Sequence, residues 1–255
     1  MKHLRLLLTA SLLLSFGRLA GAWEVTGREA LPAPEGIEFQ RISVATGSQK
    51  AELHVVSFRT AKHRLAVLDD ADGKQSMAKA ADEAGAVAAV NGGYFHPDRR
   101  PLGLVLSGGK KLHGYEKARL LSGLVLAGRD QMTLVRAAQY KPAKWHTEAL
   151  QAGPFLIDGG KAVAGLNAKR AAARTVVVTH KATGRAALLV CKWVTLAEMA
   201  EILAVPDLLP GGAVARALNL DGGSSTGLWV GQEGSGFHMR EGRVVRNYLA
   251  VIPKK

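Results

Sequence analysis

Short apolar runs, separated by polar or glycine-containing turns, follow one another along most of the chain. In Ile37–Ala45 apolar and polar residues alternate, as they do in a strand with one buried face. The alternation slips at Gln40-Arg41, which predicts a β-bulge there, and Leu53–Phe58 slips in the same way at Val55-Val56. Similar runs predict further strands at Arg64–Leu68, Ala86–Val90, Leu102–Leu106, Leu120–Leu126, Met132–Val135, Pro154–Ile157, Thr175–Thr179, Ala186–Val190, Ala217–Leu220, Thr226–Val230 and Tyr248–Ile252.

Helical signals are confined to two segments. Ser76 is a suitable N-cap for a helix over Ser76–Glu83, and Thr195 with Glu198 forms a capping box that starts a second helix ending near Leu203. Strands outnumber helices and many connections are short. This favours the α+β class, with a large mixed or antiparallel sheet and few helices in a single domain, over a doubly wound parallel sheet.

The N-terminus has the pattern of a secretory signal. A basic start is followed by an apolar stretch over 6–16 and by the small residues Ala20-Gly21-Ala22. We therefore expect a signal peptide at 1–22, a mature domain at 23–255, and a periplasmic or extracellular location. The alternative is an uncleaved anchor, but the apolar stretch is well short of the ~20 residues that a span needs. No stable membrane insertion is expected after cleavage.

The composition is globular, with 47% hydrophobic and 22% charged residues. Removing the signal takes Lys2, Arg5 and Arg18 from a formal charge of +13, which leaves +10 on the mature chain. Such a surface is attracted to anionic polymers or phosphate-bearing glycans, although a diffuse basic surface without a partner is the simpler interpretation. Nucleic acid is not expected as a partner, because aromatic residues are only 5% and no basic run is interleaved with them.

No metal or cofactor is expected. Cys191 is the single cysteine, which excludes a site built from several thiolates and predicts a buried small hydrophobe in its apolar strand. None of the eight histidines forms a His-Glu-x-x-His pair or a similar ligand spacing. His96 lies just past Asn91–Phe95, where its ordinary pKa would suit proton transfer at neutral pH.

Five glycine pairs occur along the chain; Gly211-Gly212 lies in a predicted loop, and the other four divide into two kinds. Gly108-Gly109 and Gly159-Gly160 lie between short strand-like runs and predict hairpin turns. Gly92-Gly93 and Gly222-Gly223 instead follow runs that are compatible with buried strands, directly after Asn91 and Asp221. Strand ends are where a rigid scaffold presents chemistry to a cleft, so these two corners are candidates for a ligand site. Asn and Asp are also common turn formers, which is the structural alternative.

At these corners the sequence resembles the phosphodiester glycosidase family. The segments that carry the resemblance occur in the family's order and cover roughly residues 85–252. They are Ala89–Phe95, Gln151–Gly159, Arg174-Thr175, Leu218–Thr226 and Arg243–Val251. One departure is Val176-Val177-Val178, because the family has a small residue and then glycine soon after the Arg-Thr pair; this bears on the pocket near Arg174.

The resemblance implies an exported hydrolase that cleaves the C1–O bond of a sugar-1-phosphodiester, in envelope or exopolysaccharide metabolism. A phosphate leaving group needs little protonation, so the site needs positive charge, N–H donors and one base or nucleophile. Asp221 is the expected carboxylate and Arg174 the expected phosphate clamp. Asn91 is expected to donate to phosphate or to a sugar hydroxyl. The amides of Gly92, Gly93, Gly222 and Gly223 are expected to form an anion nest.

The remaining expected contacts lie next to these corners. Tyr94 and Phe95 are candidates for stacking on a sugar or for packing in the core, and Asn247 for orienting a site residue. Ser224 is expected at the phosphate, and a serine-nucleophile site over 224–226 is disfavoured because no Gly-x-Ser-x-Gly elbow is present. Two other functions stay open: a non-catalytic binder of anionic glycans, and a metal-dependent phosphodiesterase that cleaves the P–O bond.

Overall fold

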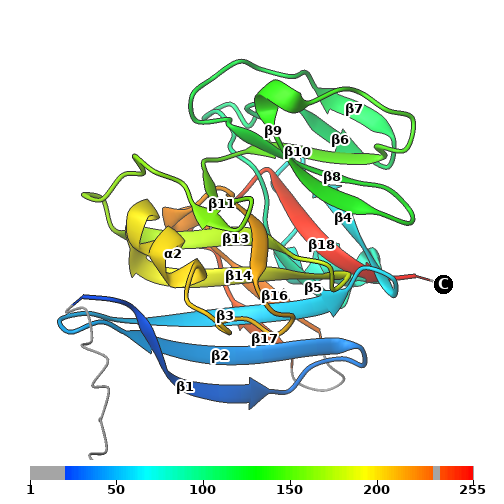
Figure 1. Ribbon diagram of the computed structural model, residues 1–255. Coiled ribbons are helices and arrows are strands. Elements are labelled where there is room, and N and C mark those ends of the chain that lie inside the picture. Colours follow the sequence, from blue (N-terminus) through cyan, green and yellow to red (C-terminus); the bar gives the residue numbers. More distant parts are fainter. Residues whose placement is uncertain (1–20, 232–235, 255) are drawn as a thin grey trace, which may run out of the picture.

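The computed structural model describes residues 21–231 and 236–254 and consists mainly of antiparallel sheet. The predicted signal peptide therefore lies almost entirely outside the described residues. In the described part, three sheets and two α-helices form one domain, which confirms the α+β expectation (Figure 1). No helix in the described ranges has the length and apolar character needed to span a bilayer.

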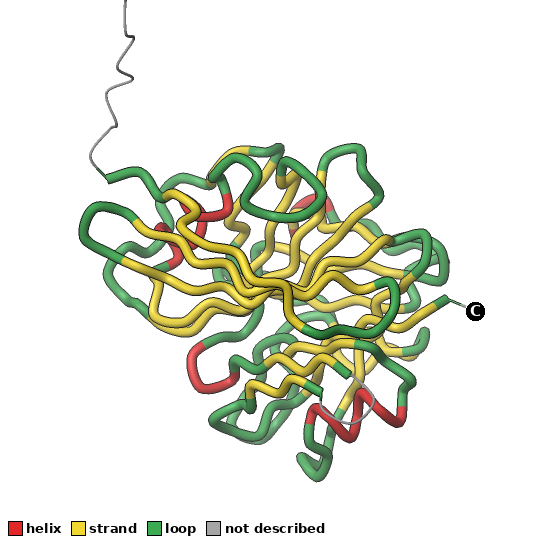
Figure 2. Tube along the Cα trace, turned by 90° about the horizontal axis from the view of Figure 1, so that it is seen from below, coloured by secondary structure: helices red, strands yellow, loops and turns green. Residues whose placement is uncertain are grey.

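The large sheet has the strand order β1-β2-β3-β14-β13-β15-β11-β12. Its strands are β1 (Glu24–Leu31), β2 (Ile37–Ala45), β3 (Lys50–Arg59), β14 (Arg185–Val194), β13 (Ala172–His180), β15 (Val214–Asn219), β11 (Phe155–Asp158) and β12 (Lys161–Ala162). Seen from below, these strands are strongly twisted and fan out from the centre of the molecule (Figure 2).

Two smaller sheets pack beside it. One has the order β7-β6-β10-β8-β9, with β7 (Lys110–His113), β6 (Val105–Ser107), β10 (Glu148–Ala152), β8 (Gly123–Ala127) and β9 (Met132–Arg136). The other has the order β17-β16-β5-β18-β4, with β17 (Phe237–Met239), β16 (Leu228–Val230), β5 (Ala88–Asn91), β18 (Asn247–Pro253) and β4 (His63–Asp69). Short 3-10 turns occur at Ala137–Gln139 and Gly223–Ser225.

The large sheet is buried on both faces, and this explains the slips in the strand pattern. In β3, Leu53 and Val55 face one core cluster while Val56 and Phe58 face another. The pairing of β2 with β3 runs without a register shift, so the bulge predicted at Gln40-Arg41 is wrong. In β2 and in β3, the apolar residues at one end of the strand pack against one core cluster, and those at the other end pack against the second cluster on the opposite face. The alternation of apolar and polar residues therefore changes phase within each strand.

Both predicted helices are present, with the predicted caps. α1 (Met77–Glu83) begins after Ser76, whose hydroxyl accepts the Lys79 N–H at 3.3 Å. α2 (Leu196–Leu203) begins after Thr195, and both hydrogen bonds of the capping box form. Its apolar residues Met199, Ile202 and Leu203 are buried against one face of the large sheet. The other face packs on the strands of the two smaller sheets.

The two hairpins predicted from glycine pairs are confirmed. Ser107 pairs with Lys110, and Asp158 pairs with Lys161, on either side of the glycines. All four glycines have φ between 56° and 82°, the left-handed region that glycine enters without strain.

One strand that the pattern missed, β10, carries polar residues into the interior. The Glu148 carboxylate of β10 accepts the N–H groups of Val67 (2.9 Å) and Gly108 (3.0 Å), which joins β4 to the β6–β7 turn. Gln151 of the same strand is fully buried, accepts the N–H of Leu104 at 2.9 Å and donates to the carbonyl of Glu116 at 2.7 Å. A polar residue in a run argues against a buried strand when only the sequence pattern is considered. In the fold, the side chains of Glu148 and Gln151 are both hydrogen-bonded to backbone groups.

We expect Gln151→Ala to lower the free energy of unfolding by about 1–3 kcal/mol, because the buried Leu104 N–H loses its acceptor. Gln131→Ala is the matched control: Gln131 is exposed, and surface substitutions of this kind change stability within about 0.5 kcal/mol. Urea unfolding of the two variants measures the difference, and equal midpoints would contradict the assigned role of Gln151.

Candidate active site

The two glycine corners and the Arg174 segment meet at one place in the fold. Asp221 donates its backbone N–H to the Gly92 carbonyl at 3.1 Å, which joins the end of β5 to the segment after β15. Gly222 packs on the start of β13, where a Cβ would lie 2.7 Å from the Ala173 carbonyl oxygen. Three segments far apart in sequence thus converge, as the sequence analysis expected.

Asn91 joins these segments through hydrogen bonds in the interior of the protein. It is fully buried; its Oδ1 accepts the Thr175 hydroxyl at 2.6 Å and the Gly227 N–H at 3.2 Å, while its Nδ2 donates to the Asp221 carbonyl at 2.8 Å. The sequence analysis expected Asn91 to donate to a ligand. Its side-chain amide has no exposed surface, so it does not reach one. Its hydrogen bonds instead give it a positioning role.

The anion nest predicted at Gly92 and Gly93 is wrong. The Gly92 N–H donates to the Asn247 carbonyl at 2.8 Å, and the Gly93 N–H donates to Asn247 Oδ1 at 2.9 Å. Both donors therefore have partners inside the protein. A Cβ at position 92 would lie 2.0 Å from Asn247 Oδ1, so this corner needs glycine for close packing against the fully buried Asn247.

Asp221 presents the carboxylate of the site. It is partly exposed, and its Oδ1 accepts the Gly222 N–H at 2.8 Å. Burial is the largest influence and raises the pKa of Asp221, while the Ser225 hydroxyl, the Gly222 N–H and the charge of Arg243 oppose the rise. Gly223 and Ser224 are exposed beside it. In the described part of the chain neither N–H group has a backbone acceptor outside this turn, and the donor role predicted for Gly223 stays a prediction.

Tyr94 and Phe95 follow the Gly92-Gly93 corner, and Tyr94 packs against one core cluster while Phe95 packs against another. The Tyr94 hydroxyl donates to the Gly153 carbonyl at 2.6 Å, and burial, with the charge of Asp221, raises its pKa. Arg174 acts on the same hydroxyl in the opposite direction. Phe95 carries the guanidinium of Arg243 over one ring face, 4.9 Å from the centroid. That face is therefore occupied by a cation.

Arg174 lies on β13 close to the Asp221 corner. Its side chain is oriented by hydrogen bonds to β14 and to the segment before β13. Its Nε donates to the Val194 carbonyl at 3.0 Å and its Nη2 to the Arg170 carbonyl at 2.6 Å, and burial lowers its pKa. Both hydrogen-bond partners are carbonyl groups, and Glu198 is the carboxylate whose charge acts on the guanidinium and opposes the lowering of its pKa. After it, Val177 faces one core and Val176 and Val178 the other, which explains three valines in a strand buried on both faces.

Arg243 is the residue that the sequence analysis missed. It is exposed, and it is the cation whose charge lowers the pKa of Asp221. Arg243 is the first residue of the last segment that resembles the family, and this position was the only sequence feature that could have marked it as a site residue. The Gly242 N–H donates to the Ser224 carbonyl at 2.8 Å, which ties the Arg243 segment to the Asp221 corner.

A basic cavity of about 570 Å³ opens beside this corner, lined among others by Lys74, His238, Arg240, Glu241, Arg243 and Tyr248. The carboxyl of Glu241 is mostly buried, and burial raises its pKa; His238 Nε2 lies 3.8 Å from it. Glu241 is a second carboxyl group near the site that the sequence analysis did not select.

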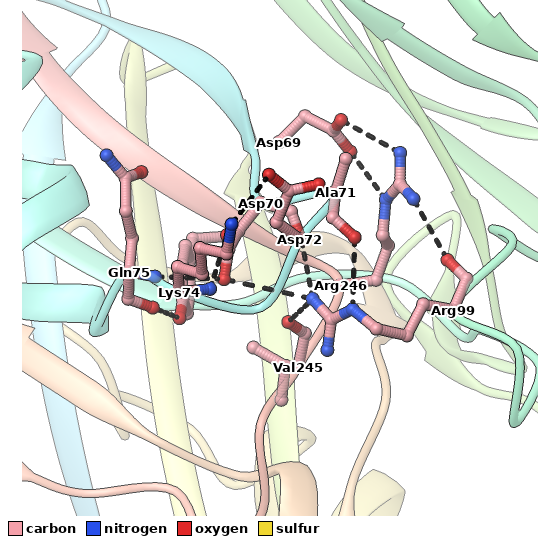
Figure 3. A network of polar contacts seen from close by, with 10 residues as sticks. Asp69, Asp70, Ala71, Asp72, Lys74, Gln75, Arg99, Val245 and Arg246 are labelled. Atoms are coloured by element: carbon pink, nitrogen blue, oxygen red, sulfur yellow. Dashed lines mark hydrogen bonds and ion pairs between the residues drawn. The ribbon is translucent and has the colours of Figure 1, made fainter.

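A polar network fixes one wall of this cavity (Figure 3). The Asp70 carboxylate accepts the N–H groups of Lys74 (3.1 Å) and Gln75 (3.4 Å). Arg99 donates to the carbonyls of Asp70, Ala71 and Val245, and Arg246 makes a two-pronged ion pair with Asp69 at 2.8 and 2.9 Å. The wall formed by 73–76 is therefore held to the segment that carries Arg243.

No group of three or more His, Cys, Asp or Glu side chains is placed to hold a metal ion within 21–231 and 236–254. Cys191 is buried, and burial raises the pKa of its thiol to about 12, as expected for a small apolar residue rather than a reactive thiolate. His96 is partly buried and its backbone N–H donates to the Arg100 carbonyl at 2.8 Å.

Proteins of the same fold are found among the solved structures. A hypothetical protein from Synechocystis has 18% identity and a TM-score of 0.66 over 88% of this chain, which spans 64% of that protein. The catalytic domain of zebrafish N-acetylglucosamine-1-phosphodiester alpha-N-acetylglucosaminidase, auto-inhibited by its pro-peptide, has 16% identity and a TM-score of 0.63, with 91% of this chain and 88% of that chain covered. No curated protein matches the sequence.

The family model of the phosphodiester glycosidases matches residues 84–252. This span includes the Asn91 and Asp221 corners, the Arg174 strand and the Arg243 segment. The match covers more than half of the chain and agrees with the resemblance seen in the sequence. The chain belongs to the phosphodiester glycosidase family.

Proposed function

We propose that the protein is an exported hydrolase that cleaves the C1–O bond of a sugar-1-phosphodiester and releases the sugar and a phosphomonoester. Family membership and the fold shared with the zebrafish enzyme support a phosphodiester glycosidase. The observation that carries the proposal is Asp221, a carboxylate that burial and three hydrogen-bonded segments fix next to Arg243. The N-terminal signal pattern supports export.

The chemistry of the bond fits this arrangement. An ordinary glycosidase needs one carboxylic acid to protonate the leaving oxygen and a second carboxylate at the sugar. A phosphomonoester leaves as a stabilised anion, so it needs cations more than a proton. Arg243, whose charge acts on Asp221, and Arg174, whose charge acts on Tyr94, supply positive charge, and Asp221 supplies the base or nucleophile.

The bond changes are simple. The oxygen of water becomes attached to C1, the electron pair of the C1–O bond leaves with the phosphate oxygen, and the proton lost by water passes to the carboxylate of Asp221 or to solvent. If Asp221 attacks C1 first, water then opens the sugar ester at the same carbon. The oxygen of water enters the sugar by either route, and the phosphate keeps its four oxygens.

The buried polar residues keep this geometry in place. Asn91 holds the Asp221 carbonyl, and Asn247 holds Gly92 and Gly93. The exposed Gly223 and Ser224 follow Asp221 closely in the chain, and we expect them to contact a phosphate oxygen of the substrate. We infer that Gly222 is needed for its close packing on Ala173 rather than for its N–H, which Asp221 already uses.

We expect Asp221→Asn to fold normally and to lose about 100- to 10,000-fold in kcat/KM on a sugar-1-phosphodiester, because an amide is neither base nor nucleophile. Asp130→Asn, an exposed aspartate on a turn, is the matched control. Release of free sugar together with thermal unfolding measures both properties. Turnover retained by a folded Asp221→Asn variant would remove the proposed mechanism.

Hydrolysis in oxygen-18 water tests which bond breaks. C–O cleavage predicts label in the released sugar at C1 and none in the phosphomonoester. Label in the phosphate would instead assign a phosphodiesterase acting at phosphorus, and inactivation by chelator would then identify a metal-dependent one. Salt-sensitive binding of anionic glycans without any turnover would assign a binding protein.

The pH profile tests the electrostatics of Asp221. Burial raises its pKa and Arg243 lowers it, so Arg243→Gln should raise the pKa further. Because the ionised carboxylate is the active form, kcat/KM should fall on the acidic side at a higher pH in Arg243→Gln than in the wild type. Arg240→Gln, an exposed neighbour, should leave the acidic limb in place. Identical limbs in all three proteins would contradict the coupling of Arg243 to Asp221.

A further inference from the structure

Trp193 is the most exposed large hydrophobic residue of the described chain. Its exposed fraction is 79%, against 38% for Tyr115, 43% for Leu120 and 55% for Val244. Its φ of 60° lies in the left-handed region, which bulky L-residues seldom adopt. The chain thus holds a large aromatic ring in solvent in a conformation that costs free energy, and such strain occurs where a ligand is bound more often than elsewhere.

A bulge in the large sheet places this ring beside the proposed active site. Ala172 pairs with Val194 and Arg174 pairs with Cys191, so one residue of β13 faces two residues of β14, one of which is Trp193. Bulges of this kind redirect side chains and are frequent next to active sites. The following residue, Val194, provides the carbonyl that accepts the Arg174 Nε–H. The positions of Trp193 and Arg174 are therefore coupled through the backbone.

The ring borders a groove of about 410 Å³, which we call the Trp193 groove. Charged and polar side chains that can bond to hydroxyl groups line it together with the ring and with Met239 of β17. They are Lys50, Glu52, His54 and Lys192. A flat apolar ring surrounded by donors and acceptors fits the alternating CH faces and hydroxyl edges of a sugar.

A protein partner fits this surface less well. A protein interface needs a contiguous apolar centre, whereas the other exposed large hydrophobics lie on different segments of the fold, at Tyr115, Leu120 and Val244. The lysines at 50 and 192 instead favour a glycan that carries negative charge.

We propose that the Trp193 groove is a subsite for a second sugar ring of an acidic glycan chain, whose terminal sugar-1-phosphodiester occupies the Asp221 site. This inference rests on the proposed function for the identity of the Asp221 site. β14, β13 and β15 are neighbours in the sheet, so the strand that carries Trp193 lies about 10 Å from the strand that leads to Asp221. An oligosaccharide spans this interval and a single sugar ring does not, so the substrate is an extended glycan.

Native electrophoresis in gels containing alginate, an acidic polyuronate, tests the subsite without requiring turnover. We expect alginate to retard the wild type, Trp193→Ala to bind about tenfold more weakly, and Trp193→Phe to retain most of the binding. Trp193→Gly suits the positive φ, so it should lose binding while keeping the thermal stability of the wild type. Tyr115→Ala is the control for a partly exposed aromatic elsewhere.

This experiment distinguishes a failure of the proposed subsite from a failure of the proposed reaction. Asp221→Asn should bind alginate as the wild type does, so loss of hydrolysis and loss of the subsite are distinct observations. Equal retardation of wild type, Trp193→Ala and Trp193→Gly would overturn the proposal, and so would a wild type that alginate does not retard. Retardation of the wild type by neutral dextran as strongly as by alginate would overturn the assignment of an acidic glycan.

Discussion

The site depends on one buried side chain, the amide of Asn91. It accepts hydrogen bonds from the Thr175 hydroxyl and the Gly227 N–H, and it donates to the carbonyl of Asp221. A buried amide with three partners defines the relative positions of β5, β13 and the segment after β15, because each unmade bond would leave a polar group unsatisfied in the interior. This bond network places the backbone of Asp221, and its carboxylate accepts the Gly222 N–H of its own loop.

Asn247 does the same for the other corner. By occupying the N–H groups of Gly92 and Gly93, it converts a potential anion-binding loop into a rigid support. The consequence for the chemistry is that positive charge at the site comes from side chains. Arg243 is exposed and acts on Asp221, while Arg174 is partly buried and acts on Tyr94.

Partial burial of the carboxylate suits the proposed chemistry. Desolvation raises the pKa of Asp221, and a more basic carboxylate is a better proton acceptor and nucleophile when ionised. The nearby cation limits this rise, so the ionised form persists where it is needed. In the proposed reaction the same cation also stabilises the departing phosphate, so that one residue serves both the carboxylate and the leaving group. The bulge at Trp193 interrupts the pairing of β13 with β14 at the groove that we propose as a subsite for a longer ligand.

The sequence by itself determined the elements whose signals are local. Both helix caps, both glycine hairpins and most strands follow from capping residues, turn residues and short apolar runs, which act within a few residues of the chain. The two corners at Asn91 and Asp221 could also be selected, because each polar residue follows a buried strand and precedes a glycine pair.

Only the tertiary structure decided which polar groups remain available to a ligand. That Asn247 satisfies Gly92 and Gly93, that Glu148 and Gln151 are buried in a strand, and that Arg243 rather than Arg174 acts on Asp221 all depend on segments far apart in sequence. A donor's availability is set by whatever packs against it, and no local pattern encodes that. The phase slips in β2 and β3 have the same origin, because burial on both faces of a sheet is a property of the layers around it.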